Sequence, residues 1–151
     1  TKELSSSNEN NMWMALIDYK RQYALGHNIK FNDYIEYGNY TTIRSIDLCV
    51  ILGNLIDNAI EAEDKERERR EVKVIIKNSF GAVYVCVENY ISQGRVDTES
   101  FMGNSTKEHP EDHGYGLKTV QEIVNDYGGQ FKISDKDKYI CVEVLLYPYK
   151  K

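Results

Sequence analysis

The 151-residue sequence has little of several features that define whole classes of proteins. It contains two prolines, and it has no apolar run near the roughly 20 residues that span a bilayer. Its net charge of −5 argues against a general nucleic-acid-binding protein. Its three cysteines are odd in number and lie in apolar runs, which favours buried thiols in a reducing cytosol over a disulfide or metal site.

What remains is the composition of an ordinary globular domain, with 41% hydrophobic and 28% charged residues. Mixed helices and strand pairs predict an α/β two-layer sandwich, in which helices cover one face of a mostly antiparallel, mixed sheet. The expected helices are Asn11–Leu25, Leu48–Ala62 and Gly114–Tyr127. The expected strands are Ile29–Tyr37, Val72–Lys77, Val83–Asn89, Gln130–Ser134 and Tyr139–Leu146.

Local signals predict where these elements end. Gly26 and Gly128-Gly129 fit helix stops, and Ser45 fits an N-cap. The segment Asn78–Gly81 is a turn signal that makes a hairpin of the strands on either side of it. The charged run Glu63–Glu71 is expected to be a solvated helix end and loop.

The helix Leu48–Ala62 has an unusual polar face. Asn54, Asn58 and Glu61 fall on one side of it, opposite its apolar residues. Two Asn residues one turn apart each cost roughly 0.5 kcal/mol or more of helix propensity relative to Ala. Their oxygens suit magnesium, which takes few protein ligands and keeps phosphate oxygens and water. Considered alone, this face fits an ordinary solvated surface equally well.

A long polar segment, Tyr90–His113, has almost no periodicity and is predicted to be a functional lid. The motif His113-Gly114-Tyr115-Gly116-Leu117 follows it and directly precedes the last predicted helix. Glycines in this position free backbone N–H groups to bind an anion, and the helix N-terminus adds partial positive charge. Taken alone, the motif also fits a simple turn from a loop into a helix.

Together these motifs, in this order and ending in Gly-Gly, resemble the GHKL ATPase superfamily and its Bergerat-type ATP-binding fold. The resemblance covers roughly residues 29–146 and is closest to the catalytic domain of sensor histidine kinases. Within that group, three segments are similar to the peptide-quorum-sensing and LytS-like branch: Asn58–Ala62, Ser105–Lys107 and Gly114–Leu117.

The resemblance implies roles for the polar face of the helix. Asn54 and Asn58 match the N box of the family, whose second Asn holds the magnesium that bridges the nucleotide phosphates. Glu61 matches its third position, beside the phosphates or a metal-bound water. Hydrolytic members carry Glu at the first position, where Asn54 cannot take a proton, so the sequence favours a kinase over an ATPase.

Further nucleotide contacts follow from the same resemblance. Gly114 and Gly116 match the G2 box, whose amides line the triphosphate. Ser105, Thr106 and Lys107 match the end of the lid, where Lys107 could meet the γ-phosphate. The candidate catalytic residues are therefore Asn54, Asn58, Glu61 and Lys107, and the other motif positions counted as nucleotide contacts are Ala62, Tyr115 and Leu117.

One position departs from the family. The G1 box usually has an Asp that accepts the adenine amino group, and Asn89 stands there, without the usual glycines. The Asn89 carbonyl can accept the same hydrogen bond, but its amide adds a donor and removes the charge.

These matches imply the cytoplasmic catalytic domain of a membrane-bound sensor histidine kinase, which moves the γ-phosphoryl of MgATP to a histidine on a dimerisation helix. Residues 1–28 would connect it to the upstream dimerisation region, and residues 29–151 would form the ATP-binding domain. The full-length protein would be a homodimer that acts indirectly on a response regulator. His27 is expected in a surface loop, and His109 and His113 border the lid. A docking module that binds nucleotide weakly, or a GHKL ATPase, is the alternative.

Overall fold

The computed structural model describes residues 2–36, 38–63, 69–92 and 110–148, with side chains for 12–36, 38–63, 69–92 and 116–148. The described elements follow in the order α1 (Lys2–Gly26), β1 (Lys30–Ile35), α2 (Ser45–Glu63), β2 (Glu71–Ser79), β3 (Ala82–Tyr90), α3 (Pro110–Asp126), β4 (Gln130–Lys136) and β5 (Tyr139–Leu146). This order confirms the predicted succession of helices and strands. α1 begins well before the predicted Asn11.

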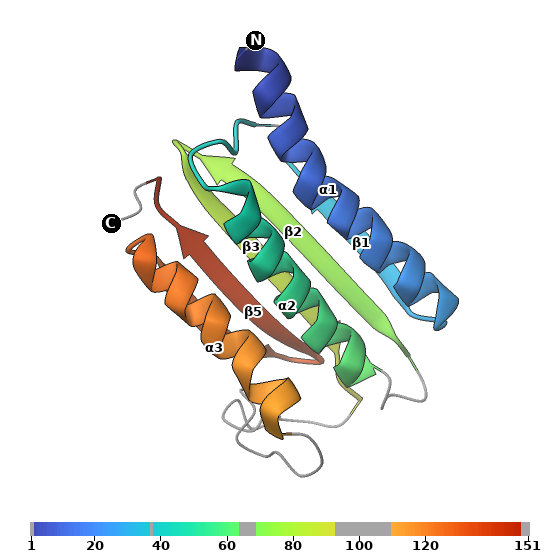
Figure 1. Cartoon of the computed structure of the whole chain (residues 1–151). Helices are drawn as coiled ribbons and strands as arrows, with labels where there is room; N and C mark the ends of the chain where they lie inside the picture. Colours follow the sequence, from blue (N-terminus) through green and yellow to red (C-terminus); the bar gives the residue numbers. More distant parts are fainter. Residues whose placement is uncertain (1, 37, 64–68, 93–109, 149–151) are drawn as a thin grey trace.

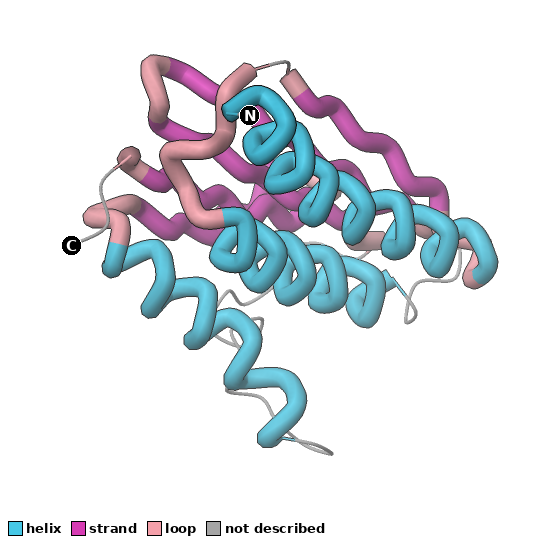
Figure 2. Tube along the Cα trace, turned by 45° about the horizontal axis from the view of Figure 1, so that its top comes forward, coloured by secondary structure: helices cyan, strands magenta, loops and turns pink. Residues whose placement is uncertain are grey.

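The strands form one five-stranded sheet in the order β1-β2-β3-β5-β4. β1 and β2 are parallel, whereas the other neighbouring pairs are antiparallel. Figure 1 shows the three labelled helices side by side across the sheet, with α2 between α1 and α3. Figure 2 shows all three helices on one side of the strands, which confirms the predicted two-layer α/β sandwich.

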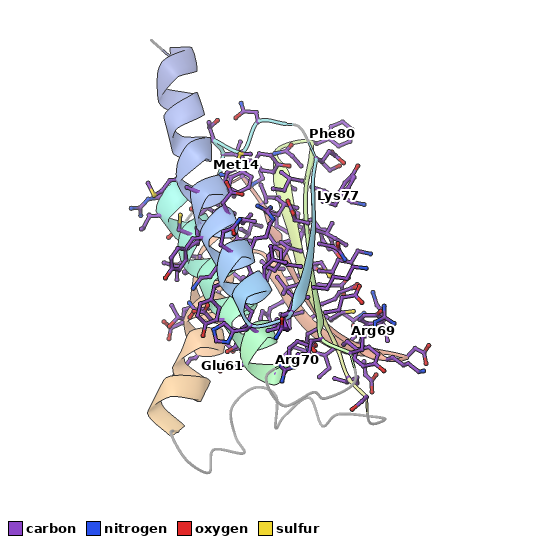
Figure 3. All side chains as sticks on the ribbon, turned by 90° about the vertical axis from the view of Figure 1, so that its right-hand side faces the viewer. Met14, Glu61, Arg69, Arg70, Lys77 and Phe80 are labelled. Carbon is purple, nitrogen blue, oxygen red and sulfur yellow. The ribbon has the colours of Figure 1, made fainter. Side chains whose placement is uncertain are left out.

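The core lies between the two layers, as the sequence pattern requires. In β2, Val72, Val74 and Ile76 are buried beneath the helices, while Lys73 and Lys77 point to the other face. Figure 3 shows Lys77 pointing away from the helix layer. The helices contribute Trp13, Ile17, Leu48, Ile51, Leu52, Leu55, Ile56, Leu117, Val120 and Val124. None of the described helices is long and apolar enough to cross a bilayer.

Two helix ends differ in detail from the prediction. α1 ends at Gly26 as expected, but the left-handed residue is Asn28, with φ of 59°. The N–H of Ile29 donates to the Ala24 carbonyl at 2.9 Å, and this bond caps the last turn of α1. At the start of α2, the Leu48 N–H donates to the Arg44 carbonyl at 3.1 Å. Arg44 therefore occupies the N-cap position that we predicted for Ser45.

A pair of hydrogen bonds joins the end of α3 to the start of α2. The Tyr127 hydroxyl donates to Asp47 Oδ2 at 2.6 Å and accepts from the Arg44 N–H at 3.1 Å. Burial, followed by the hydrogen bond to Asp47, raises the pKa of Tyr127 to about 12, so the hydroxyl stays neutral and can donate. Asp47 is only 8% exposed, and Tyr127 satisfies it there.

The hairpin between β2 and β3 turns more tightly than predicted. The strands pair as far as Ser79 and Ala82, which leaves Phe80 and Gly81 as a two-residue turn. Both have positive φ, 52° and 84°. Such a turn favours Asn or Asp before Gly, because a bulky side chain is strained in the left-handed region. Phe80 is also fully exposed, at the tip of the β2–β3 hairpin in Figure 3.

We therefore expect Phe80→Asn to raise the free energy of unfolding by about 1 kcal/mol, since Asn tolerates the left-handed conformation and no burial is lost. Urea denaturation measures the change. Ser79→Asn, one residue earlier in the same exposed hairpin, is the control, because Ser79 does not have positive φ. Equal stability of the Phe80→Asn variant and the unchanged chain would contradict the strain.

Candidate functional site

α2 separates its polar and apolar residues as the sequence predicted. Its buried side chains lie against the sheet and the other helices: Asp47, Leu48, Ile51, Leu52, Leu55, Ile56, Ala59, Ile60 and Glu63. Asn54, Asn58 and Ala62 are half-buried, and Glu61 is exposed. Figure 3 shows Glu61 near the C-terminal end of α2. The polar face is therefore partly covered and is not an ordinary solvated surface.

Asn54 lies at the contact between α2 and α3. Its Nδ2 donates to the Val50 carbonyl, one turn back on the same helix, at 2.9 Å. Its Oδ1 faces α3, where a Cβ added to Gly116 would lie 2.9 Å from it. The structure thus brings together the first N-box Asn and the second glycine of the G2 motif, and the missing side chain of Gly116 makes room for the amide.

Gly116→Ala tests this close approach. Ala is about 1 kcal/mol better than Gly in a helix interior, but overpacking costs about 1–3 kcal/mol. Because Asn54 is held by its bond to Val50, we expect a net loss of stability of about 1 kcal/mol. Gly53→Ala in α2 is the matched control, since its added Cβ would meet only Leu16 Cδ2, at 3.8 Å. That variant should gain about 1 kcal/mol in urea denaturation. Equal gains for both variants would show that Asn54 gives way freely.

Asn58 lies one turn beyond Asn54. Its Nδ2 is buried and has no hydrogen-bond partner among the described residues. A buried amide left unpaired costs about 1–3 kcal/mol, so it calls for an explanation. A bound anionic group would satisfy the nitrogen, and the side-chain oxygen is the type of ligand that magnesium prefers.

Asn89 presents a second unpaired amide. It is 1% exposed, near the end of β3, and its Nδ2 also lacks a partner in the described part of the chain. Along β3, it shares a face with Val83, Val85 and Val87, which pack beneath the helices. α2 packs directly on β3, so both amides belong to elements that meet in the core.

The glycine motif does not lie where the sequence analysis placed it. α3 begins at Pro110, so Gly114 and Gly116 are helical residues and do not precede the helix. Proline at the first position, followed by Glu111 and Asp112, favours a helix start there. Free N–H groups are confined to the first turn of a helix, so in this conformation the cradle predicted for these glycine amides is not open.

The remaining candidates fall into two groups. Leu117 is 0% exposed and packs in the core, which leaves only its backbone for a ligand. Ser105, Thr106, Lys107 and His109 lie outside the described residues, as does most of the predicted lid, and the side chains of His113 and Tyr115 are likewise not described. Of the lid ends, Tyr90 belongs to β3, and Pro110 to His113 belong to α3.

Sequence reasoning missed a buried carboxylate at the C-terminal end of α2. Glu63 is 0% exposed, although the run Glu63–Glu71 was predicted to be a solvated helix end. Its position, one turn after Ala59 and Ile60 on the buried face of α2, was the available signal. Arg70, in the same run, donates from its guanidinium to the His27 carbonyl at 3.1 Å in an exposed hydrogen bond.

Solved structures of similar fold come from histidine kinases. The nucleotide-free catalytic domain of histidine kinase ThkA matches with a TM-score of 0.71 at 19% identity, covering 94% of this chain and 95% of that one. Histidine kinase AdeS of Acinetobacter baumannii matches with a TM-score of 0.62 at 13% identity, covering 91% of this chain and 65% of that one. The histidine kinase domain of the Erythrobacter litoralis EL346 blue-light activated kinase gives 0.58 at 15%, covering 87% and 60%.

At these identities the matches show the fold, which is that of histidine kinase catalytic domains. No match is found among curated protein sequences. The sequence pattern of the family described as the GHKL domain matches residues 43–147, from just before α2 to just after β5. That span is more than half of the sequence and contains both N-box Asn residues, Asn89 and the glycine motif, so the chain belongs to the GHKL domain family.

Proposed function

We propose that this chain binds MgATP and transfers its γ-phosphoryl group to a histidine on a dimerisation helix, as the catalytic domain of a sensor histidine kinase. The observation that carries the proposal is the pair of buried, unpaired amides of Asn58 and Asn89, on α2 and β3 of a GHKL domain. Unpaired buried amides are costly to keep, and a nucleotide offers acceptors for both of them.

The residues present fit a magnesium nucleotide. Asn58 would supply the oxygen ligand, and nucleotide phosphates and water would complete the shell, since magnesium commonly takes one or two protein groups. When bound, the metal neutralises charge that develops on the phosphates. Asn89 would bind the base, and Glu61, which is exposed one turn beyond Asn58, would face the metal-bound water.

Asn54 favours transfer over hydrolysis. Hydrolysis needs a group that positions or deprotonates water, and an amide cannot take a proton. Its amide is also engaged by the Val50 carbonyl and the Gly116 contact, so it acts as a spacer between helices. Phosphoryl transfer to an imidazole requires mainly positioning and charge neutralisation, which this chain can supply to a partner domain.

Calorimetric titration with MgADP, which binds without turnover, tests the proposal directly. We expect a dissociation constant between about 1 μM and 1 mM, or roughly −8 to −4 kcal/mol. No heat at millimolar MgADP would contradict it and would favour a docking module that retains the fold without the nucleotide.

A further inference from the structure

Asn89 is a polar side chain in an apolar setting. It pairs in the sheet with Val72 of β2 and Ile140 of β5, both buried. It is itself 1% exposed, and no described residue accepts a hydrogen bond from its Nδ2. Its cross-strand neighbours on this face are apolar, so the sheet offers no acceptor to the Nδ2 donor.

An amide and a carboxylate recognise different partners. A carboxylate offers only acceptors, whereas an amide offers an acceptor beside a donor, and a half-turn of the amide plane exchanges the two. The GHKL resemblance implies an Asp at this position, so Asn89 adds the donor that is left unpaired here. The amide can therefore pair with both groups of a base edge that presents one donor and one acceptor.

Purine bases differ at position 6 in the arrangement of their hydrogen-bond donors and acceptors. Adenine presents a donor amino group beside the N1 acceptor, whereas a 6-oxo purine presents the O6 acceptor beside the N1–H donor. An amide complements either edge in one of its two orientations. A carboxylate offers only acceptors, so it pairs with one group of either edge, the amino group of adenine or the N1–H of a 6-oxo purine, and leaves a second acceptor facing N1 or O6.

We propose that Asn89 makes this site accept 6-oxo purine nucleotides, of the inosine and guanosine type, as well as adenine nucleotides. The inference rests on the proposed function, since it assigns Asn89 to the base of the bound nucleotide. It deepens that function by setting the range of nucleotides that the chain binds.

Calorimetric titrations with MgADP and MgIDP test this, because inosine differs from adenosine only at the position 6 edge. We expect the two dissociation constants to agree within about tenfold. Asn89→Ala removes both hydrogen bonds to the base and should weaken the binding of each nucleotide by roughly 10- to 100-fold, the contribution of a bidentate base contact. Asn32→Ala, on the opposite face of the sheet in β1, also removes an amide and should leave both dissociation constants unchanged.

The outcomes separate the two proposals. If ADP binds and IDP binds more than about 100-fold more weakly, the inference fails and the proposed function stands. If neither nucleotide binds at millimolar concentration, the proposed function fails and the inference falls with it. Unchanged dissociation constants in a folded Asn89→Ala variant would remove Asn89 from the base. In that variant a similar loss for both nucleotides supports the inference, and a loss confined to ADP overturns it.

Discussion

The Asn58→Ala variant should bind MgADP at least about tenfold more weakly than the unchanged chain, with a much smaller loss for metal-free ADP. The proposed oxygen ligand is removed, and even indirect partners of metal ligands contribute about 10- to 100-fold to metal affinity. Calorimetry with and without magnesium measures both affinities. Asn125→Ala, which removes an exposed amide from the last turn of α3, should change neither.

The same variant should be more stable than the unchanged chain without ligand. Ala is the better helix former by roughly 0.5 kcal/mol, and the unpaired amide costs about 1–3 kcal/mol. Weaker binding by a more stable fold would mean that Asn58 is kept for the ligand. Equal losses of affinity with and without magnesium would instead remove Asn58 from the metal.

Labelled ATP should leave this chain unlabelled on its own and should label a histidine only when the dimerisation domain of the same kinase is added. His27 is exposed in the turn after α1, and its ring stacks on Tyr23 with centroids 4.3 Å apart. That setting is not the dimerisation helix on which the resemblance places the phosphoacceptor histidine. The expected difference is nearly all-or-none, because positioning by two domains supplies most of the catalysis.

His27→Ala is the decisive control for that experiment. It should transfer label to the added domain as well as the unchanged chain does, because His27 takes no part. Acid-labile label that appears on the isolated chain and disappears in His27→Ala would overturn this division of labour. Rapid release of inorganic phosphate without the partner would point to a GHKL ATPase and away from a kinase.

Much of the fold follows from local pattern. The period of apolar residues in α2 predicted its buried face, and the alternation in β2 and β3 predicted a hairpin, because each of these elements buries one side. The candidate polar residues on α2 were found in the same way. The exposure of these polar residues was not predicted from the pattern. It depends on how closely α3 approaches Asn54, a contact that joins distant parts of the chain.

The features that sequence analysis missed depend on non-local contacts. Asp47 and Tyr127 are hydrogen-bonded, yet they lie 80 residues apart. The left-handed residue after α1 is Asn28 rather than Gly26, because the turn into β1 selects where the chain reverses. α3 starts at Pro110, earlier than predicted, because a proline can occupy the first position of a helix as readily as it can follow the end of one.

The hydrogen bonds of Tyr127 have a consequence for motion. They fix the C-terminal end of α3 to the start of α2, where Gly128, with φ of 62°, also closes the helix. These bonds therefore anchor the C-terminal end of α3, and they do not hold the N-terminal part, which carries the glycine motif. The exchange rate of the backbone amide hydrogens should accordingly decrease from Gly116 to Val124. A Tyr127→Phe substitution should release the held end and make the exchange rates of these amides more nearly equal.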